Sequence, residues 1–426
     1  MLKFANFESM SHLEISPSRQ PKGRIVLPAS KSISNRALLI NALAGSTKLP
    51  ENLSDSDDTS VMLRALQEMP ETIDIGAAGT AMRFLTAYLS VTPGEHVITG
   101  TERMRHRPIA ILVDALRQLG ASIAYDGEEG FPPLRIVGND KLEGGKLTVP
   151  GDVSSQYISA LLMIAPTLRR GLRLTLTGQI ASKPYLEMTI SMMREFGAKV
   201  NWLEESIIEV LPCPYERLDY HIESDWSAAS YWYEIAALST DENTQIDLVG
   251  LHHDSIQGDS RVWRLFSELG VETQFCVEPD GTEITRLQKS GTTTGYFSYD
   301  FTHQPDLAQT FAVTCSMLNV PFHLYGLQSL RIKETDRIAA LMKELGKIVR
   351  LEEKDNELLW EGGSAERQEN SQLIFDTYED HRMAMSLAPV CLRTGSQIRI
   401  NNPEVVSKSY PAFWNDLEKA GFKICR

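Results

Sequence analysis

The sequence predicts a mixed α/β protein of two similar domains, each built from three related units. The chain has 426 residues, which is enough for two or three domains. Of these residues, 42% are apolar and 23% are charged, a balance typical of globular proteins. An internal repeat and a mixture of amphipathic helices with short apolar strands predict the domains and their units.

The repeat consists of an amphipathic helix that ends near a glycine and continues into a short apolar strand. Consecutive copies are separated by 77, 73, 76 and 75 residues, and their glycines are Gly120, Gly197, Gly270, Gly346 and Gly421. Each glycine stands where a helix end favours a left-handed backbone conformation. A weaker sixth copy ends at Pro70, 50 residues before Gly120, and indicates a first unit that has lost a strand or two.

Apolar periodicity locates several of the helices and strands. Helices are expected at 34–44 and 155–165, and short strands at 172–178 and 396–401. Helices and strands do not alternate strictly, which argues against a single doubly wound sheet. Six units of about 75 residues divide naturally into two domains of three.

The acidic balance of the chain restricts its partners. The formal net charge is -14, which argues against binding to nucleic acid or to an anionic membrane. If the substrates are anions, cations must therefore gather locally in a cleft.

Cysteine usage and hydropathy indicate a cytoplasmic protein. The five cysteines are widely spaced and form no CxxC pair, so reduced thiols are expected, with no disulfide framework and no zinc site. No apolar segment approaches the length that spans a bilayer. The N-terminal stretch has no basic region followed by an apolar run, so no secretion signal is expected.

Cations and hydroxyls gather at the start of the first predicted apolar helix. Lys31, Ser32, Ser34, Asn35 and Arg36 stand there. Free backbone N–H groups at a helix start, together with hydroxyls and two cations, are suited to a phosphate. The alternative is a capped helix with charges on its surface.

Three further helix starts carry hydroxyl, amide or glycine residues. They contain Ser154, Ser155 and Gln156; Ser182, Lys183 and Tyr185; and Gly79 and Thr80. Several such starts facing one cleft would bind anions, although capping is the commoner explanation for any one of them. The segment at Gly79 is not a P-loop, because the lysine after the last glycine is missing.

Charged residues also precede apolar helices in the second half of the chain. Lys333 and Arg337 are four residues apart, so we expect both on one helical face, with Glu334 three residues before Arg337. The alternative for this group is an ion-pair ladder on the surface. Asp306 begins another apolar helix, where N-capping alone would explain an aspartate.

A polar triplet begins one more apolar helix. Asp380, His381 and Arg382 are either a cap or part of a site, and a histidine alone is more often structural than catalytic.

Taken together, these segments resemble the 5-enolpyruvylshikimate-3-phosphate synthase family. The matching stretches run from about residue 27 to residue 416 and follow the order of the family: KSISNRALL, NLSDSDD, AAGTAMR, RMRHRPIAILVDALRQLGA, SSQYISALLMIAP, SKPY, DWSAASYW, HQPDLAQT, LRIKETDR, EDHRMAMS and SKSYPAFW. The resemblance therefore covers essentially the whole chain.

The resemblance implies an inside-out α/β barrel in each of two domains, built from three βαβαββ units, with the first unit shortened. The expected domains are 28–225, and 1–27 plus 226–426, with the active site in the cleft between them. No metal and no organic cofactor is expected. The protein is expected to be a cytoplasmic monomer that acts on small molecules.

The resemblance also implies which residues bind the substrates. For shikimate-3-phosphate they are Lys31, Ser32, Arg36, Ser154, Ser155, Gln156, Ser182, Asp306 and Lys333. For phosphoenolpyruvate they are Lys31, Gly79, Arg107, Gln156, Arg337, Arg382 and Lys408. These sets contain seven different cations, which would neutralise the negative charge of two phosphates and two carboxylates.

The implied reaction transfers the enolpyruvyl group of phosphoenolpyruvate to the 5-hydroxyl of shikimate-3-phosphate. It passes through a tetrahedral intermediate, releases phosphate, and belongs to the pathway to chorismate and the aromatic amino acids. Proton transfer at two places requires carboxylates and a lysine. Asp306 and Glu334 are the expected proton acceptors, and Lys31 is the expected donor or electrostatic partner.

Two alternatives differ from this expectation in specific residues. The sister family that transfers enolpyruvyl to a UDP-amino sugar carries a cysteine just before the position of Arg107, and this chain has none there. A non-catalytic anion-binding homologue would have lost Lys31, Asp306 or Glu334, and all three are present. Ala77 stands where the family commonly has asparagine, so one hydrogen-bonding group is missing beside the expected phosphoenolpyruvate site.

Overall fold

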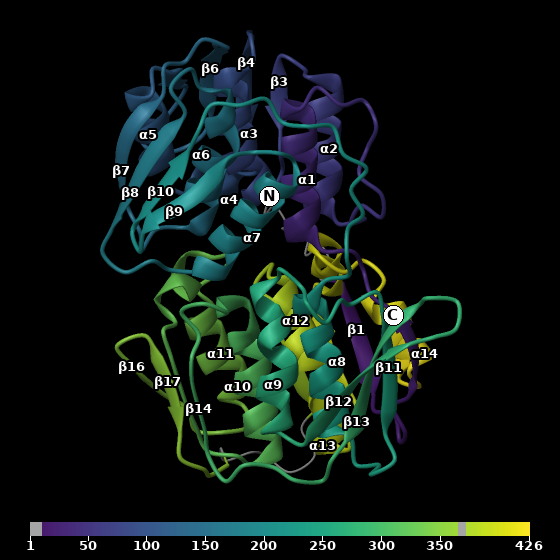
Figure 1. Ribbon diagram of the computed structural model, residues 1–426. Helices are drawn as coiled ribbons and strands as arrows, with labels where there is room; N and C mark the ends of the chain where they lie inside the picture. The colour runs from purple at the N-terminus through teal and green to yellow at the C-terminus, as the bar shows by residue number, and fades with distance from the viewer. Residues whose placement is uncertain (1–10, 365–371) are drawn as a thin grey trace, which may run out of the picture. The chain divides into compact units, whose positions relative to one another are not determined.

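The computed structural model describes residues 11–364 and 372–426, which form two compact units (Figure 1). Unit 1 contains the described residues of 1–28, 224–255 and 259–426, and unit 2 contains 29–223 and 256–258. Each unit has a hydrophobic core of its own. The stretch 1–10, which belongs to the segment predicted to lack a secretion signal, lies outside the described residues.

Unit 2 contains two four-stranded sheets, ordered β3-β4-β6-β5 and β7-β8-β10-β9. The strands are β3 (Thr72–Asp74), β4 (Gly94–Thr99), β5 (Ser122–Tyr125), β6 (Leu134–Gly138), β7 (Gly145–Pro150), β8 (Leu172–Thr177), β9 (Val200–Glu204) and β10 (Ile207–Val210). The helices are α1 (Lys31–Leu43), α2 (Asp57–Glu68), α3 (Gly79–Val91), α4 (Glu102–Arg105), α5 (Ala110–Gln118), α6 (Ser155–Ile164) and α7 (Lys183–Glu195), with the 3-10 turn η1 (Ala165–Thr167).

Unit 1 contains three four-stranded sheets, ordered β12-β13-β11-β2, β14-β15-β17-β16 and β18-β19-β1-β20. The strands are β1 (His12–Ser16), β2 (Gly23–Val26), β11 (Gln245–Val249), β12 (Val271–Val277), β13 (Glu283–Lys289), β14 (Phe297–Asp300), β15 (Phe322–Tyr325), β16 (Glu352–Lys354), β17 (Glu357–Trp360), β18 (Leu373–Phe375), β19 (Ile398–Asn401) and β20 (Lys423–Cys425). The helices are α8 (Trp226–Leu238), α9 (Val262–Ser267), α10 (Ala308–Leu318), α11 (Arg337–Leu345), α12 (His381–Leu387), α13 (Cys391–Thr394) and α14 (Phe413–Lys419). The 3-10 turns are η2 (Gly258–Arg261), η3 (Pro305–Leu307), η4 (Gln328–Ile332), η5 (Ala388–Val390) and η6 (Pro403–Lys408).

The five sheets repeat one pattern, which confirms the predicted fold class. Each sheet has one parallel strand pair and two further antiparallel pairings; β14, α10, β15, α11, β16 and β17 form it without interruption, whereas the sheets that contain β1 and β2 are assembled from distant parts of the chain. This is a βαβαββ unit. The chain ends meet in one copy, because β1 pairs antiparallel with both β19 and β20.

The first βαβαββ repeat, which lies in unit 2, is shortened further than expected. Among the described residues it supplies α1 and α2 but no four-stranded sheet, and a single parallel bridge joins Glu51 to His221. The expected helices 34–44 and 155–165 are present as α1, which begins three residues earlier, and α6.

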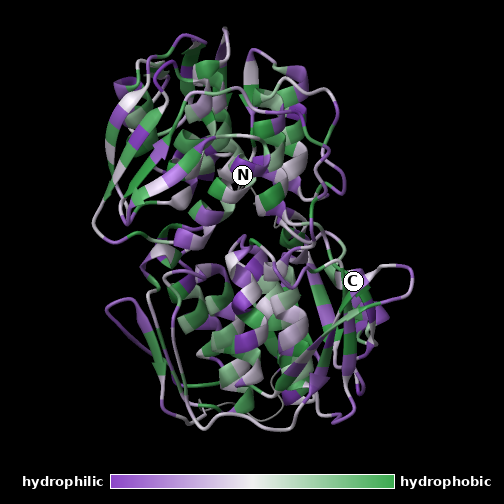
Figure 2. Ribbon diagram, in the orientation of Figure 1, coloured by the Kyte–Doolittle hydropathy of each residue, from purple (hydrophilic) through white to green (hydrophobic). Residues whose placement is uncertain are grey.

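Helices occupy the interior of each unit and sheets its outside. Every residue of α3 is buried, and α8 is buried from Trp226 to Leu238 except at Ser227. Strands instead alternate between buried and exposed residues, as β8 does. Figure 2 shows the same contrast in hydropathy within each unit. None of the helices in the described parts is long and apolar enough to cross a bilayer.

The repeat glycines follow the prediction at four positions out of five. Gly120, Gly197, Gly270 and Gly421 have φ of 101°, 82°, 83° and 94°, as left-handed helix ends require. The prediction is wrong at Gly346, where φ is −57°. A Cβ there would lie 2.3 Å from the carbonyl oxygen of Met342, so close backbone approach favours this glycine.

Candidate functional site

Arg337 is the centre of a buried charge cluster in unit 1. Its side chain is 1% exposed, and its three nitrogens donate to three carboxylates: Nε to Asp380 Oδ2 at 2.7 Å, Nη1 to Asp306 Oδ1 at 2.9 Å, and Nη2 to Glu334 Oε2 at 2.9 Å. Burial opposes the charge of the guanidinium, but the three carboxylates outweigh it and raise the pKa of Arg337. The surface ion-pair ladder is therefore wrong for this residue.

Asp306 joins Arg337 to two further cations. Arg382 Nη2 donates to Asp306 Oδ2 at 2.9 Å, and Lys333 Nζ lies 3.4 Å from Asp306 Oδ1. Burial would raise the pKa of Asp306, yet Arg382, Lys333 and Arg337 together hold it well below its usual value. Asp306 therefore stays ionised. Its carboxylate makes these ion pairs, and no side-chain cap is formed at the start of α10.

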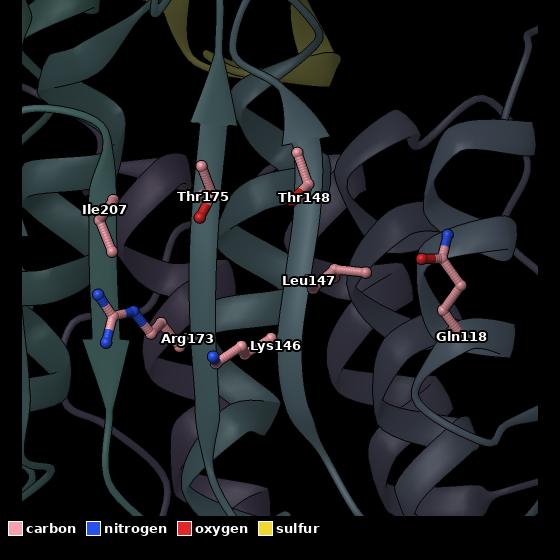
Figure 3. Close-up of a pocket in the computed structure, with 7 residues that line it drawn as sticks. All are labelled: Gln118, Lys146, Leu147, Thr148, Arg173, Thr175 and Ile207. Carbon is pink, nitrogen blue, oxygen red and sulfur yellow. The ribbon is translucent and has the colours of Figure 1, made fainter.

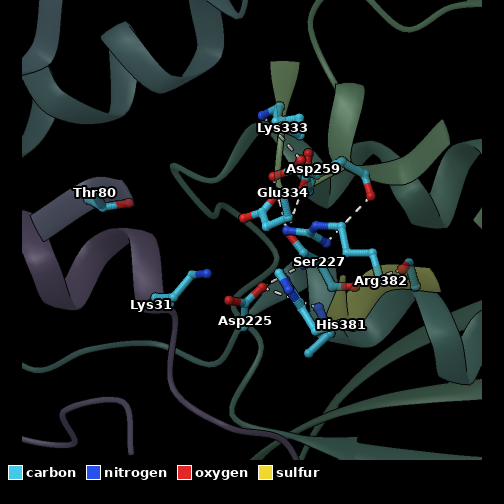
Figure 4. Close-up of polar contacts among 12 residues, drawn as sticks. Lys31, Thr80, Asp225, Ser227, Asp259, Lys333, Glu334, His381 and Arg382 are labelled. Carbon is cyan, nitrogen blue, oxygen red and sulfur yellow. Dashed lines mark hydrogen bonds and ion pairs between the residues drawn. The ribbon is translucent and has the colours of Figure 1, made fainter. Parts of the chain in front are cut away.

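Lys333 and Glu334 do not lie on a helix, so the predicted shared helical face is wrong. α11 begins at Arg337, because Asp336 accepts the N–H of Ala339 at 3.1 Å as its N-cap. Lys333 ends η4 in an extended conformation instead. Both side chains reach the cluster from this connection, and Figure 4 shows Lys333 and Glu334 close to Arg382.

The start of α12 is a cap and part of the cluster at once. Asp380 Oδ1 accepts the N–H of Arg382 at 2.8 Å, while Oδ2 binds Arg337. Arg382 Nη1 also donates to the hydroxyl of Tyr231 at 3.4 Å. His381 is 1% exposed. Asp380 thus both caps α12 and belongs to the charge cluster.

Arg36 is buried in unit 2 among hydroxyls and carbonyls. Its Nε donates to Thr189 Oγ1 at 2.7 Å and its Nη1 to the carbonyl of Ser32 at 2.9 Å, and the guanidinium lies 5.4 Å from the ring centre of Phe84. Burial lowers the pKa of Arg36 to about 10. Within the described residues no carboxylate pairs with it, so the site favours an external anion.

Lys31, at the start of the same helix, has a carboxylate neighbour. Its Nζ lies 3.7 Å from Asp58 Oδ2, and its side chain is 14% exposed. Ser30 caps α1 by accepting the N–H of Ile33 at 3.4 Å, so the hydroxyl of Ser32 does not serve as the cap.

Gly79 begins α3 against two guanidinium groups of unit 2. A Cβ at Gly79 would lie 2.7 Å from Arg107 Nη1 and 3.2 Å from Arg83 Nη1. At the next position Thr80 accepts a hydrogen bond from Gln156 Nε2 at 3.1 Å, which joins α3 to α6. Gly79, Arg107 and Gln156 are thereby brought together, as the sequence analysis expected of residues for one ligand.

The predicted serines differ in how far capping explains them. Ser154 caps α6 by accepting the N–H of Gln156 at 3.4 Å, and Ser155 is the first residue of that helix. Ser182 precedes α7 in a left-handed conformation, with φ of 53°, and makes no cap bond. Capping therefore does not explain Ser182, which is strained as well as buried. Lys408 lies at the end of η6 in unit 1.

Several residues around these groups were not among the expected site residues. They are Asp58, Arg83, Tyr231, Asp259 and Asp380. Asp380 was noted beside Arg382 at the start of its helix, but its ion pair with Arg337 joins residues 43 apart and had no local signal. The contact of Tyr231 with Arg382, 151 residues apart, had none either. Asp58 lies in the matching stretch NLSDSDD and was detectable there.

Unit 2 also contains a hollow of about 470 Å³. It is lined by Gln118, Lys146, Leu147, Thr148, Arg173, Thr175 and Ile207, on β7, β8 and their neighbours (Figure 3). None of the expected site residues lines it. Among the described residues, no group of three or more His, Cys, Asp or Glu could hold a metal ion.

The chain is similar to known proteins over nearly its whole length. Residues 15–74 and 68–417 match the family described as EPSP synthase (3-phosphoshikimate 1-carboxyvinyltransferase). A protein of Bacteroides fragilis named 3-phosphoshikimate 1-carboxyvinyltransferase is 56% identical over 419 residues, which cover 97% of this chain and 99% of that protein. A protein of the same name from Shewanella pealeana is 36% identical over 439 residues, 96% of this chain and 99% of its own length.

A solved structure shares the fold. The EPSP synthase of Acinetobacter baumannii superposes with a TM-score of 0.75 at 21% identity, and covers 97% of this chain and 100% of its own.

The βαβαββ units and these full-length matches define an enzyme of the transferase class. The chain belongs to the EPSP synthase family. The resemblance inferred from the motifs is thereby confirmed.

Proposed function

We propose that the protein transfers the enolpyruvyl group of phosphoenolpyruvate to the 5-hydroxyl of shikimate-3-phosphate and releases phosphate. The observation that carries this proposal is the cluster of Arg337, Arg382 and Lys333 around Asp306 and Glu334. It supplies cations for an anionic substrate and carboxylates for proton transfer in one place. Family membership supports the same reaction.

Residues of both units would serve the phosphorylated ring acid. We assign its phosphate to Ser154, Ser155 and Ser182, with Gln156 beside them, and its ring and carboxylate to Lys31, Ser32, Arg36, Asp306 and Lys333. The buried Arg36 supports this assignment, because a guanidinium without a described carboxylate partner gains most from a bound anion. The hydroxyl of Ser182 supports it too, because it is not engaged as a helix cap.

Phosphoenolpyruvate would be bound by cations, by a side-chain amide and by the backbone N–H groups at the start of α3. We assign it to Lys31, Gly79, Arg107, Gln156, Arg337, Arg382 and Lys408. The space at Gly79 is filled by guanidinium nitrogens, so the backbone N–H groups at the start of α3 and the charge of Arg107 act at the same point.

The addition moves two protons, and the elimination removes one. In the addition, the 5-hydroxyl oxygen bonds to C2 of phosphoenolpyruvate, its proton passes to a carboxylate, and C3 gains a proton to become a methyl group. In the elimination, the methyl group loses a proton and the C2–O bond to phosphate breaks, which restores the vinyl group. Asp306 and Glu334 are the acceptors, and Lys31 is the donor or electrostatic partner.

A coupled assay of phosphate release from phosphoenolpyruvate and shikimate-3-phosphate tests the function. Folded protein without activity above background would refute it. Asp306→Ala and Glu334→Ala should each retain phosphoenolpyruvate binding by calorimetry and lose about 100- to 10,000-fold in kcat, the range of general acid–base catalysis. If both variants bind and turn over normally, the assigned roles are wrong. Arg173→Gln, on β8 outside the site, serves as the control for loss of a charge.

We also propose that the enzyme acts as a cytoplasmic monomer. Five free cysteines support a reducing compartment. Sedimentation of the purified protein at working concentration tests the monomer directly.

A further inference from the structure

Asp259 is a buried carboxyl beside the charge cluster for which the proposed reaction has no role so far. It lies in η2 and is 3% exposed. The hydroxyl of Ser227 donates to its Oδ2, and within the described residues its Oδ1 has no hydrogen-bond partner. No described cation forms an ion pair with it. An isolated carboxylate in such a place is costly, so a bound proton stabilises Asp259.

Helix α8 connects Asp259 to the cations of the cluster. Ser227, which binds Asp259, and Tyr231, which binds Arg382, are four residues apart on α8 and share one face. Figure 4 shows Asp259 and Ser227 beside Arg382. The start of α8 is capped by Asp225, which accepts the N–H of Ser227 at 2.7 Å, so the charge of Asp225 is directed at the helix end.

The cluster itself is balanced without Asp259. Among the described residues, its ion pairs join three cations, Arg337, Arg382 and Lys333, to three carboxylates, Asp306, Glu334 and Asp380. The ring of His381, which is charged only if protonated, lies 3.9 Å from Asp380. An ionised Asp259 would add a fourth negative charge, and an arriving anion would then be repelled. A protonated Asp259 leaves the cations able to accept the anion.

We propose that Asp259 takes up a proton when the cluster of Arg337, Arg382 and Lys333 binds an anion. When the anion binds, Asp306, which is held by three cations, keeps its charge, and Asp259, which is held by a hydroxyl, takes up the proton. The inference rests on the proposed function only for the identity of the anion, which would be phosphoenolpyruvate.

The charges that act on Asp259 agree with this division. Burial is the largest influence and raises the pKa of Asp259 to about 7, and the charges of Asp306 and Asp225 raise it further, while Ser227 and Arg382 oppose the rise. Asp259 also acts electrostatically on Tyr299 of β14, on which Arg261 acts with the opposite sign. Near neutral pH the carboxyl is therefore divided between its two forms, and a bound anion shifts it to the protonated one.

Calorimetry with sulfate tests the coupling directly, because sulfate does not itself titrate near neutral pH. Binding measured in two buffers of different ionisation enthalpy gives the number of protons taken up. From a midpoint of about 7, we expect uptake of at most roughly half a proton at pH 7 and a larger uptake at pH 8 in the unaltered enzyme. Asp259→Asn, which keeps a neutral group of the same shape, should bind sulfate without proton uptake.

Two further variants make the test specific. Ser227→Ala removes the hydrogen bond that favours the charged carboxylate, so infrared absorption of the protonated carboxyl should persist to higher pH than in the unaltered enzyme. Asp247→Asn removes a carboxylate of the same unit that pairs with Arg286 outside the cluster, and should leave proton uptake unchanged.

The inference is overturned if Asp259→Asn takes up protons as the unaltered enzyme does, or if the unaltered enzyme binds sulfate without uptake. Failure of sulfate to bind at pH 6 overturns it as well. Because sulfate binding and the carboxyl absorption need no turnover, a negative phosphate-release assay would refute the proposed function and leave the test of Asp259 intact.

Discussion

Replacing Arg337 by lysine separates the geometry of the guanidinium from its charge. The three nitrogens of Arg337 donate to three different carboxylates, each within 2.9 Å, and the side chain is 1% exposed. A lysine ammonium is a single point of charge and reaches at most one of these carboxylates in good geometry. Two charge-assisted hydrogen bonds are then lost, at about 1.5–3 kcal/mol each. Breaking buried ion pairs costs about 3–5 kcal/mol in general. We therefore expect unit 1 of Arg337→Lys to lose about 3–5 kcal/mol in its free energy of unfolding.

Tryptophan fluorescence can measure the loss of unfolding free energy in unit 1 separately from unit 2. Of the six tryptophans, unit 1 contains Trp226, Trp232, Trp263, Trp360 and Trp414. Trp202 is the one in unit 2, so a Trp202→Phe background restricts the signal of a urea titration to unit 1. The substitution Arg286→Lys is the matched control, because Arg286 binds Asp247 with two nitrogens but is 33% exposed.

Exposed ion pairs contribute about 1 kcal/mol or less, so the control should lose little. If Arg337→Lys lowers the unfolding free energy no more than Arg286→Lys does, the three carboxylates do not depend on the guanidinium and the reasoning is refuted.

Three other substitutions test separate features. Burial raises the pKa of Glu234 well above its ordinary 4.5, so the stability that its proton contributes is complete below pH 4.5. That stability is lost as the pH rises, by up to about 1.4 kcal/mol per pH unit. Glu234→Gln should reduce this dependence of the unfolding free energy on pH, measured by urea titrations at pH 5 and 7.5. Gly79→Ala places a Cβ 2.7 Å from Arg107 Nη1, and displacing that guanidinium should raise KM for phosphoenolpyruvate roughly tenfold, for a loss of about 1.4 kcal/mol. Arg331 ties the segment that carries Glu334 to Asp336 and to the β16–β17 hairpin, so Arg331→Ala should lower kcat by about 10- to 100-fold through misplacement, with partial rescue in Arg331→Lys. Unchanged slope, KM or kcat, respectively, would contradict each expectation.

Local sequence patterns predicted the parts of the fold that local forces determine. The glycine-terminated helices recur because a helix end commonly needs a left-handed residue, and four of the five repeat glycines have that conformation. Gly346 also follows a helix, but a glycine is favoured there because the carbonyl of Met342 lies too close for a Cβ. A pattern of residue types does not distinguish the two.

The charge cluster shows where sequence reasoning stops. The spacing of Lys333 and Arg337 suits one helical face, but Asp336 caps the helix between them and places Lys333 outside it. The cap at Asp336 was not among the sequence predictions, and it outweighs the spacing because it satisfies an N–H group that would otherwise lack a partner. The burial of Arg337 depends on Asp306 and Asp380, which lie 31 and 43 residues away in sequence, and only the resemblance to a family indicated that these residues act together.

The pairing of β1 with β19 and β20 has a consequence for synthesis on the ribosome. All strands of unit 2 lie between residues 72 and 210, so this unit can complete both its sheets while the C-terminal part of the chain is still being made. Strand β1 emerges first, yet Leu13 pairs with Ile400 and Ile15 with Ile424. Its apolar residues therefore find their partners only after about 400 further residues have been made, so the first strand of unit 1 is also among the last to be paired.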